Sequence, residues 1–418
     1  MWRVVPVLFI VGCDPYHAWP QAGSYFPYRY TEVDGLEDYE RVRWETETWT
    51  PSTDLQSAAQ YLLKANYHRP GAPEETLFHF GRTRSSLPPV QRDDLTINFV
   101  GDVMWTGGGW ADTYSEVADL LDGDLRVGNL ETPTSPDLPT GQGDLGLYAF
   151  NASPEMLDGL PLDVVQLNNN HTLDGGDEGL DRTIEEIESR GIDYTGVDRQ
   201  LVRDVGGTKV AFLAYTWGLN TPDEPTEHEL FIIPFGHLDE KINLDRVGQD
   251  TEAAVADGAE LVVAMVHWGF EYEYYADPHF MVLGRGLLAE GVDLVVGTGP
   301  HVPEPPEYCA INIPAAEPGV GQCSLRSKDG AARFGAILYS LGNFGSAMPT
   351  IQAETGLVAT VSLVPGSGVT GLGWEAVSSV GQNAGEKLFP LASLVEEGND
   401  YEAEEIRLNQ HLGTAWKR

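Results

Sequence analysis

The chain has 418 residues, with 64 Asp and Glu against 25 Lys and Arg, so its formal net charge at pH 7 is −39. This charge argues against nucleic acid as a partner, because phosphate neutralisation needs basic side chains. It also disfavours a polyanionic substrate unless metal ions or a local basic patch reverse the sign. An apolar content of 42% predicts a globular protein, and no apolar stretch reaches the roughly 20 residues of a membrane-spanning helix.

The N-terminus predicts export. Met1–Arg3 supplies a positive charge, Val4–Val11 is a short apolar segment, and Gly12 and Cys13 follow. Residues 1–13 are therefore typical of a signal peptide, and their ending is similar to a bacterial lipoprotein box, with cleavage before Cys13 and a lipid on its thiol. We expect an exported cell-envelope lipoprotein, in the periplasm or on the outer cell surface, held to the membrane through Cys13. An ordinary signal peptide or a start-site artefact is the alternative.

Export would place the two remaining cysteines, Cys309 and Cys323, in an oxidising compartment. Three cysteines divide naturally into one that is lipidated and two that pair. We therefore expect a disulfide between Cys309 and Cys323, which would stabilise the folded chain by about 3 kcal/mol.

Residues 14–93 predict a tether and an N-terminal accessory segment. Asp14–Gly35 is rich in Pro, Tyr and Gly without a clear period, whereas the apolar residues of Asp54–Tyr67 fall on one face of a helix. At the other end of the chain, residues 381–418 predict an acidic tail that is partly helical.

Between residues 94 and 380 the pattern changes to strands that alternate with helices, which predicts an α/β domain. Its last two strands indicate a closing antiparallel hairpin. The expected strands are Leu95–Val100, Leu125–Val127, Leu162–Leu167, Lys209–Tyr215, Leu261–Val266, Leu294–Val296, Ala336–Leu341, Gly356–Val364 and Gly371–Val377. The expected helices are Val117–Leu121, Arg182–Arg190, Glu252–Ala256 and Phe280–Ala289.

Polar side chains follow several of these strands, at the end where α/β sheets bind ligands. Carboxylates, carboxamides and imidazoles do not belong in an apolar core without partners. As a set they suit one or two Mn²⁺, Fe²⁺ or Zn²⁺ ions better than Ca²⁺, which takes only oxygen ligands. The clusters are Gly101-Asp102, Gly128–Glu131, Asn169–His171, His267–Gly269 and Gly299–Val302.

Each of these residues also has an ordinary structural explanation. The Asn-rich stretch before His171 could be a turn that satisfies its own hydrogen bonds. Asp102 and Asn129 could cap the elements that follow them. His267 could be a core histidine, and His301 could lie in a plain loop. Because these residues all follow strands, we favour one shared site over separate explanations.

Six phrases in this order resemble the CapA family of poly-γ-glutamate capsule proteins, a branch of the calcineurin-like metallophosphoesterases. The resemblance covers residues 95–364 and implies a CapA-like domain at 94–380. It also implies the fold, an α/β structure with two stacked mixed β-sheets flanked by helices. The phrases are Phe99–Met104, Gly128–Pro133, Asn169–Asp174 with Gly179, His267–Tyr272, Pro300–Val302 and Tyr339–Phe344.

The resemblance implies two metal sites with a bridging ligand. The chemistry would be in-line attack of a metal-bound hydroxide on a phosphoester, stabilised by two cations about 3.5–4 Å apart. His171 would be the general acid. The implied metal ligands are Asp102 and His301 for one ion, Asn170 and His267 for the other, and Glu131 or Asn129 at the bridging position. The expected substrate-binding residues are Asn169, Asp174, Trp268 and Glu271.

Two positions depart from the superfamily's pattern. Met104 stands where the first motif has a histidine, as is usual in this branch, and Gly299 stands where the closing motif has one. About three protein ligands would remain for each metal, which suffices for a catalytic ion with an open position. Glu271, Asp174 and His279 are the candidates for replacing the missing histidine.

Two functions from different classes follow. The first is a metal-dependent hydrolase of the phosphoesterase type, anchored in the envelope and associated with synthesis or export of a capsule polymer or poly-γ-glutamate. Its substrate would be a phosphoester or an anionic polymer. The second is a non-catalytic envelope protein that keeps the fold and assembles or binds the polymer with a degraded metal site. Membrane proteins of a capsule system are expected partners in both cases.

Overall fold

The computed structural model describes residues 79–80, 87–104, 112–142, 149–220, 225–233, 244–313, 323–348, 350–381, 387–414 and 417–418. The expected signal peptide with Cys13, and the expected helix at residues 54–67, lie outside these ranges. Within them, no helix is both long and apolar enough to cross a membrane.

Most of the described strands belong to one large mixed sheet, in the order β6-β5-β2-β1-β14-β15-β13-β10-β9-β8-β7, with β11, β12 and β16 at its sides. One half contains β1 (Leu95–Val103), β2 (Leu125–Leu130), β5 (Val164–Gln166), β6 (Asp193–Thr195), β14 (Thr355–Val364), β15 (Gly368–Val380) and β16 (Lys387–Pro390). The other contains β7 (Leu201–Val205), β8 (Thr208–Thr216), β9 (Leu261–His267), β10 (Leu294–Thr298), β11 (Glu307–Ile311), β12 (Cys323–Leu325) and β13 (Arg333–Leu338). A separate hairpin pairs β3 (Gly141–Gln142) with β4 (Phe150–Asn151).

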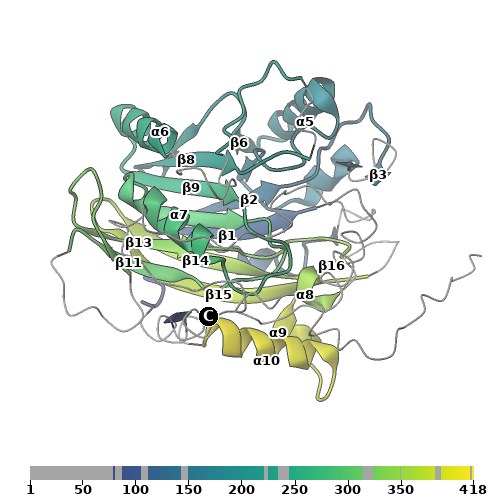
Figure 1. Ribbon diagram of the computed structural model, residues 1–418. Coiled ribbons are helices and arrows are strands. Elements are labelled where there is room, and N and C mark those ends of the chain that lie inside the picture. Colours follow the sequence, from purple (N-terminus) through teal and green to yellow (C-terminus); the bar gives the residue numbers. More distant parts are fainter. Residues whose placement is uncertain are drawn as a thin grey trace, which may run out of the picture.

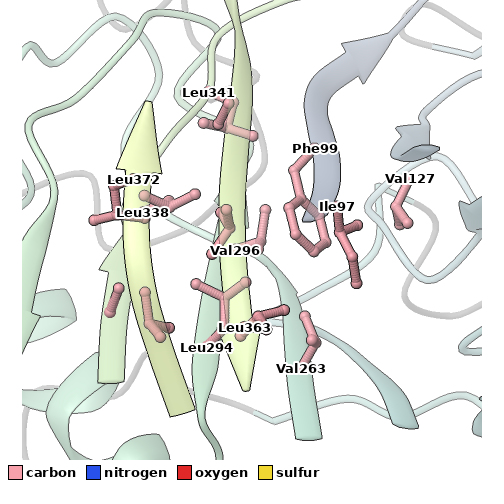
Figure 2. Close-up of a cluster of buried hydrophobic side chains, with 14 of the residues drawn as sticks. Ile97, Phe99, Val127, Val263, Leu294, Val296, Leu338, Leu341, Leu363 and Leu372 are labelled. Atoms are coloured by element: carbon pink, nitrogen blue, oxygen red, sulfur yellow. The ribbon is translucent and has the colours of Figure 1, made fainter. Parts of the chain in front are cut away.

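The two halves share one apolar core, to which both contribute fully buried residues. Figure 2 shows Ile97 and Phe99 of β1 gathered in this cluster with Leu294 and Val296 of β10. The α/β class with mixed sheets is therefore confirmed. It differs from the expectation in one respect, because the halves are joined where Phe334 of β13 pairs with Gly368 of β15. Gly368 permits this junction. Its φ is +73°, and a Cβ at this position would lie 2.1 Å from the Phe334 carbonyl oxygen.

Parallel strands bring the polar clusters to common edges. In one half β6, β5, β2 and β1 run parallel, and in the other β13, β10, β9 and β8 do. The carboxyl ends of parallel neighbours lie at the same edge of a sheet, so residues that follow them come together.

Helices flank the sheet as expected. Helices α5 and α6 lie on one side of the molecule and α10 on the opposite side, beside β15 (Figure 1). Helix α5 begins six residues before the expected start, because its first turn is polar, with Asp177 and Glu178 at the positive end of the helix dipole. The expected helix at 117–121 is a 3₁₀ turn, η3. The helical elements are η3 (Ala118–Leu120), η4 (Pro154–Gly159), α5 (Gly176–Ser189), α6 (Asp245–Ala256), α7 (Pro278–Ala289), α8 (Ile351–Glu354), α9 (Leu391–Leu394) and α10 (Asp400–Leu412).

The acidic C-terminal segment is helical, and it packs onto the domain. The Asn399 side chain caps α10 by accepting a hydrogen bond from the Glu402 amide at 2.8 Å. Leu408 and Leu412 are fully buried in the shared core. This segment is therefore part of the folded body, while the predicted domain boundaries stay predictions.

The expected disulfide is present. Cys309 and Cys323 are bonded, with their Cα atoms 4.4 Å apart. They lie directly opposite each other on the parallel strands β11 and β12, so the bond ties the edge of the sheet.

A buried carboxylate lies beside this disulfide. Glu307 of β11 is fully buried and accepts hydrogen bonds from Arg285 Nε at 2.9 Å and from the Tyr339 hydroxyl at 2.8 Å. It also contacts the His79 ring. Burial favours the protonated form, but the charges of Arg285 and His79 outweigh it and hold the pKa of Glu307 well below its usual range.

We expect Glu307→Gln to lower the free energy of unfolding at pH 5 and to lower it less at pH 3, where part of the contribution of this carboxylate is already lost. A carboxylate whose pKa is depressed by folding stabilises the protein above its unfolded pKa of about 4.3, and this contribution is lost as the pH falls through the folded pKa. Urea denaturation of wild type and variant at both pH values measures the difference. The exposed Glu116→Gln is the control, and a wild-type–variant difference that does not change with pH would contradict the assignment.

Candidate metal centre

Side chains from the ends of four strands meet in one buried cluster. Asp102 lies near the end of β1, Glu131 directly after β2, His267 at the end of β9 and His301 shortly after β10. None of these four residues is more than 4% exposed. Strand register brings them together, because Asp102 pairs with Asn129 across β1 and β2, and Thr298 pairs with His267 across β10 and β9.

The donor atoms are close enough to share a cation. His301 Nδ1 lies 3.1 Å from Asp102 Oδ2 and 3.9 Å from Glu131 Oε2. His267 Nε2 lies 3.6 Å from Glu131 Oε1. The ligand atoms of Asp102, Glu131 and His301 all lie within 4.8 Å of one another. Ligands that bind one ion at about 2.1 Å are up to roughly 4.2 Å apart, so this spacing needs little adjustment.

The electrostatics of the cluster favour a cation. Burial, and then the charge of Asp102, raise the pKa of Glu131 well above its usual value. Burial lowers the pKa of His267 to about 3, so this ring is neutral and able to bind metal. Burial also opposes the charged form of His301, but Glu131 and Asp102 outweigh it and raise the pKa of His301 to about 10. In the metal-free protein the charge of His301 therefore offsets the carboxylates, and a bound cation would take over this role as the His301 proton is released.

Glu131 provides the test of whether this set fits a metal. It is fully buried, and neither of its carboxylate oxygens accepts a hydrogen bond from the part of the chain that the structure describes. A buried carboxylate without donors is costly unless a cation takes their place. Two carboxylates with two imidazoles are a donor set for divalent transition metals, so the residues present fit the implied ion.

Hydrogen bonds distinguish Asn129 from Glu131, the two candidates for the bridging position. Asn129 donates from Nδ2 to Asp102 Oδ1 at 2.7 Å, and its Oδ1 accepts from Asn169 Nδ2 at 3.0 Å. Asn129 is therefore engaged on both sides, whereas the Glu131 oxygens are not. Asn129 therefore orients Asp102, and the bridging role of Glu131 or Asn129 stays a prediction.

The Asn-rich stretch is a turn, but it also reaches into the site. Thr172 Oγ1 closes the turn by accepting from the Asn169 amide at 2.9 Å and donating to the Leu167 carbonyl at 2.7 Å. The Asn169 side chain leaves the turn to bind Asn129, so its role here is to link the turn to the cluster rather than to bind substrate. Asn170 instead donates to Asn220 Oδ1 at 3.4 Å. Its assignment as a metal ligand stays a prediction.

His171 is held by a carboxylate. Its Nδ1 lies 2.6 Å from Asp174 Oδ2, which also accepts from the Phe150 amide at 2.7 Å. The Phe150 ring packs edge-on against the imidazole, with ring centroids 4.5 Å apart. Asp174 was expected to bind substrate, and the structure instead makes it the partner that orients His171. A carboxylate at Nδ1 leaves Nε2 as the nitrogen for proton transfer, and Asn220 Nδ2 lies 3.3 Å from it.

The expected role of Trp268 is wrong. It was expected to bind substrate, but it is 1% exposed and lies in the core under α7. Its Nε1 donates to the Tyr339 carbonyl at 3.0 Å, and the two rings stack with centroids 6.2 Å apart. An indole buried in this way packs the sheet, because its only polar atom is already hydrogen-bonded.

Two residues that orient the histidines have no role in the sequence analysis. Thr298 Oγ1 lies 3.0 Å from His267 Nδ1, and Asn343 Oδ1 lies 3.0 Å from His301 Nδ1. Asn343 belongs to the family phrase Tyr339–Phe344, but the phrase does not indicate which side chain Asn343 contacts. The Thr298 contact leaves His267 Nε2 directed at Glu131, as the outer partner of a metal-binding histidine does. Asn343 contacts the same His301 nitrogen that faces Asp102, so it orients this ring in the metal-free protein.

Gly299, in the position of the missing histidine, cannot carry a side chain in this backbone. Its φ is +111°, and a Cβ would lie 2.5 Å from the Trp268 carbonyl oxygen. Its amide instead donates to Asp102 Oδ2 at 3.1 Å. A backbone donor therefore stands where the superfamily has an imidazole.

Comparisons with known proteins found a matching family and two similar sequences. The family described as "Bacterial capsule synthesis protein PGA_cap" matches residues 96–348. The chain is 25% identical over 290 residues to the "Capsule biosynthesis protein CapA" of Bacillus anthracis, and the match covers 63% of each chain. It is 26% identical over 284 residues to the "PGA biosynthesis protein CapA" of Bacillus subtilis (strain 168), covering 63% of this chain and 67% of that one.

A solved structure, "Termus thermophilus Sulfate thiohydrolase SoxB in complex with glycerol", aligns with 78% of this chain and 62% of its own length. The two are 12% identical with a TM-score of 0.33, a likeness too low to carry an argument about function.

Proposed function

This chain belongs to the family of bacterial capsule synthesis proteins PGA_cap, and from that premise we propose that it carries a metal-dependent, phosphoesterase-type hydrolase site that serves the synthesis or export of a capsule polymer such as poly-γ-glutamate. The family membership confirms the resemblance to CapA proteins. The activity is the part that we infer from the site.

One observation carries the proposal. Asp102, Glu131, His267 and His301 converge from separate strands, while His171, which acts electrostatically on His267, has a carboxylate behind its ring. A chain of hydrogen bonds joins the two parts, from the His171 amide to Asn169, to Asn129 and on to Asp102. A purely structural cluster would not need a separately oriented histidine next to it.

The residues would divide the work in the following way. Asp102, Glu131, His267 and His301 would hold one or two Mn²⁺, Fe²⁺ or Zn²⁺ ions, and a bound ion of this kind activates water and neutralises phosphoester charge. His171 would give a proton from Nε2 to the leaving oxygen, with Asp174 holding the ring in place. The acidic chain alone would repel an anionic substrate, so the cations would also make substrate binding feasible.

We also propose that the protein works at the cell envelope, anchored through a lipid on Cys13 and assisted by membrane proteins of a capsule system. The Cys309–Cys323 disulfide supports export, since disulfides persist in oxidising compartments.

Elemental analysis of the purified full-length protein, after incubation with Mn²⁺, Fe²⁺ or Zn²⁺ and removal of the excess, tests this function. We expect one or two ions per chain and turnover of phosphoester substrates that stops on chelation. Failure to bind metal would contradict the enzyme. Metal binding without turnover of any phosphoester would favour the alternative, a polymer-assembly or polymer-binding protein with a reduced site, for which Gly299 is the supporting observation.

A further inference from the structure

The missing histidine leaves a question about how the cluster reaches a full set of ligands. Gly299 cannot be replaced by a side chain without moving the Trp268 backbone, so a substitute ligand must come from elsewhere. The sequence offers Glu271, Asp174 and His279. Asp174 is committed to His171 and to the Phe150 amide. His279 lies in the first turn of α7, where its amide is capped by Asp277 and its ring packs on Phe280.

Glu271 lies on a loop that is fastened to the loop carrying His301. The amide of the next residue, Tyr272, donates to the Pro300 carbonyl at 2.7 Å. On the other side, a Cβ at Gly269 would lie 2.8 Å from Pro300 Cγ, so the two loops are in close contact. Tyr272 and His301 both have positive φ, 65° and 59°, and their rings lie 6.2 Å apart. These contacts hold the backbone of Glu271 next to the loop that carries His301.

The Glu271 carboxylate behaves as an unfilled ligand. Its Oε2 is buried and accepts no hydrogen bond from any residue of the described ranges. Glu131, which is fully buried, likewise accepts no hydrogen bond from the described residues. The hydrogen bond from the Tyr272 amide to the Pro300 carbonyl therefore keeps the Glu271 carboxylate beside the loop that carries His301.

The C-terminal helix packs against this loop, although α10 lies outside the residues matched by the family. The Arg407 guanidinium lies 4.1 Å from the centroid of the Tyr274 ring. The His411 ring lies 4.1 Å from the Tyr275 ring, and its Nε2 contacts the Tyr274 carbonyl oxygen. A loop clamped by two aromatic contacts presents its carboxylate in a fixed position, as a metal ligand requires.

We propose that Glu271 is a metal ligand that takes the place of the histidine absent at Gly299. The inference rests on the proposed function, since it assumes that the cluster binds a divalent cation. It replaces the expectation that Glu271 binds substrate, because an ionised carboxylate repels a phosphoester or an acidic polymer and attracts the cation. The site would then contain three carboxylates, and the third would replace a neutral imidazole with a negative charge.

The test compares Glu271→Gln and Glu271→Ala with wild type by isothermal titration with Mn²⁺ and by the visible spectrum of the Co²⁺-loaded full-length protein. Loss of a supporting contact typically weakens a metal site by about 10–100-fold. Since Glu271 would be a ligand itself, we expect the Mn²⁺ dissociation constant to rise by at least this factor. The Co²⁺ spectrum should also change, because its intensity depends on the ligand set. Glu273→Gln, two residues along the same loop, should leave both measurements unchanged.

The outcomes separate this inference from the proposed function. If both Glu271 variants bind Mn²⁺ and Co²⁺ as wild type does, while Glu131→Gln does not, Glu271 is not a ligand and the metal site stands. If wild type itself binds neither ion, the inference and the proposed function fail together. Thermal unfolding of each metal-free variant shows whether a lost affinity reflects a lost ligand or a lost fold. A Glu271→Ala variant that is unfolded leaves the isosteric Glu271→Gln to decide.

Discussion

Glu131→Gln is expected to abolish stabilisation of the protein by Mn²⁺ and, in the absence of metal, to make the fold more stable than wild type. The first effect follows because Glu131 is a buried carboxylate neither of whose oxygens accepts a hydrogen bond from a described residue. A ligand at a hundred times its dissociation constant stabilises a folded protein by about 2.7 kcal/mol, and the variant would lose this contribution.

The second effect follows from the raised pKa of Glu131, which burial and the charge of Asp102 produce. A carboxylate whose pKa is raised by folding destabilises the protein as the pH rises above its unfolded pKa, about 4.3, because the folded state then binds more protons than the unfolded state. Glutamine keeps the shape without the charge, so the metal-free variant should gain most over wild type at neutral pH.

Thermal unfolding at pH 7, in chelator and in excess Mn²⁺, measures both effects. We expect the melting temperature of wild type to rise with Mn²⁺ and that of the variant to stay constant, from a higher starting value. The exposed Glu116→Gln should behave as wild type. A variant that responds to Mn²⁺ as wild type does would remove Glu131 from the metal site.

His171→Ala is expected to reduce phosphoester turnover by about 10²–10⁴-fold, the usual contribution of a general acid, without changing the metal content. The separation of the two effects is the informative part. His171 hydrogen-bonds Asp174 and contacts Asn169 only through its amide, so the cluster around Glu131 does not depend on its ring. Asp174→Asn should lower turnover less and shift the pH dependence, because it changes which ring nitrogen carries the proton.

Steady-state kinetics with the best phosphoester from the screen, paired with elemental analysis, checks this prediction. His228→Ala is the matched control, since His228 is also paired with carboxylates, Asp198 and Asp181, but lies away from the cluster. Equal turnover by wild type and His171→Ala would exclude His171 from the mechanism.

The sequence determined the features that local patterns encode. Apolar periodicity placed the strands that lead to Asp102, His267 and His301, and parallel pairing made it reasonable to expect these strand ends to meet. The α/β class, the closing hairpin of β14 and β15 and the pairing of Cys309 with Cys323 followed from spacing and composition in the same way.

Only the tertiary structure decided which side chains are engaged and which are free. Asn129 and Glu131 are two residues apart, and the sequence offers both equally as candidates for the bridging ligand. The structure shows that Asn129 is hydrogen-bonded on both sides, by residues 27 and 40 positions away. His301 is oriented by Asn343, 42 residues along the chain, and Trp268 is buried by Tyr339, 71 residues along. The physical reason is that a hydrogen-bond partner or a buried face depends on the crossing of distant strands, which residue spacing does not specify.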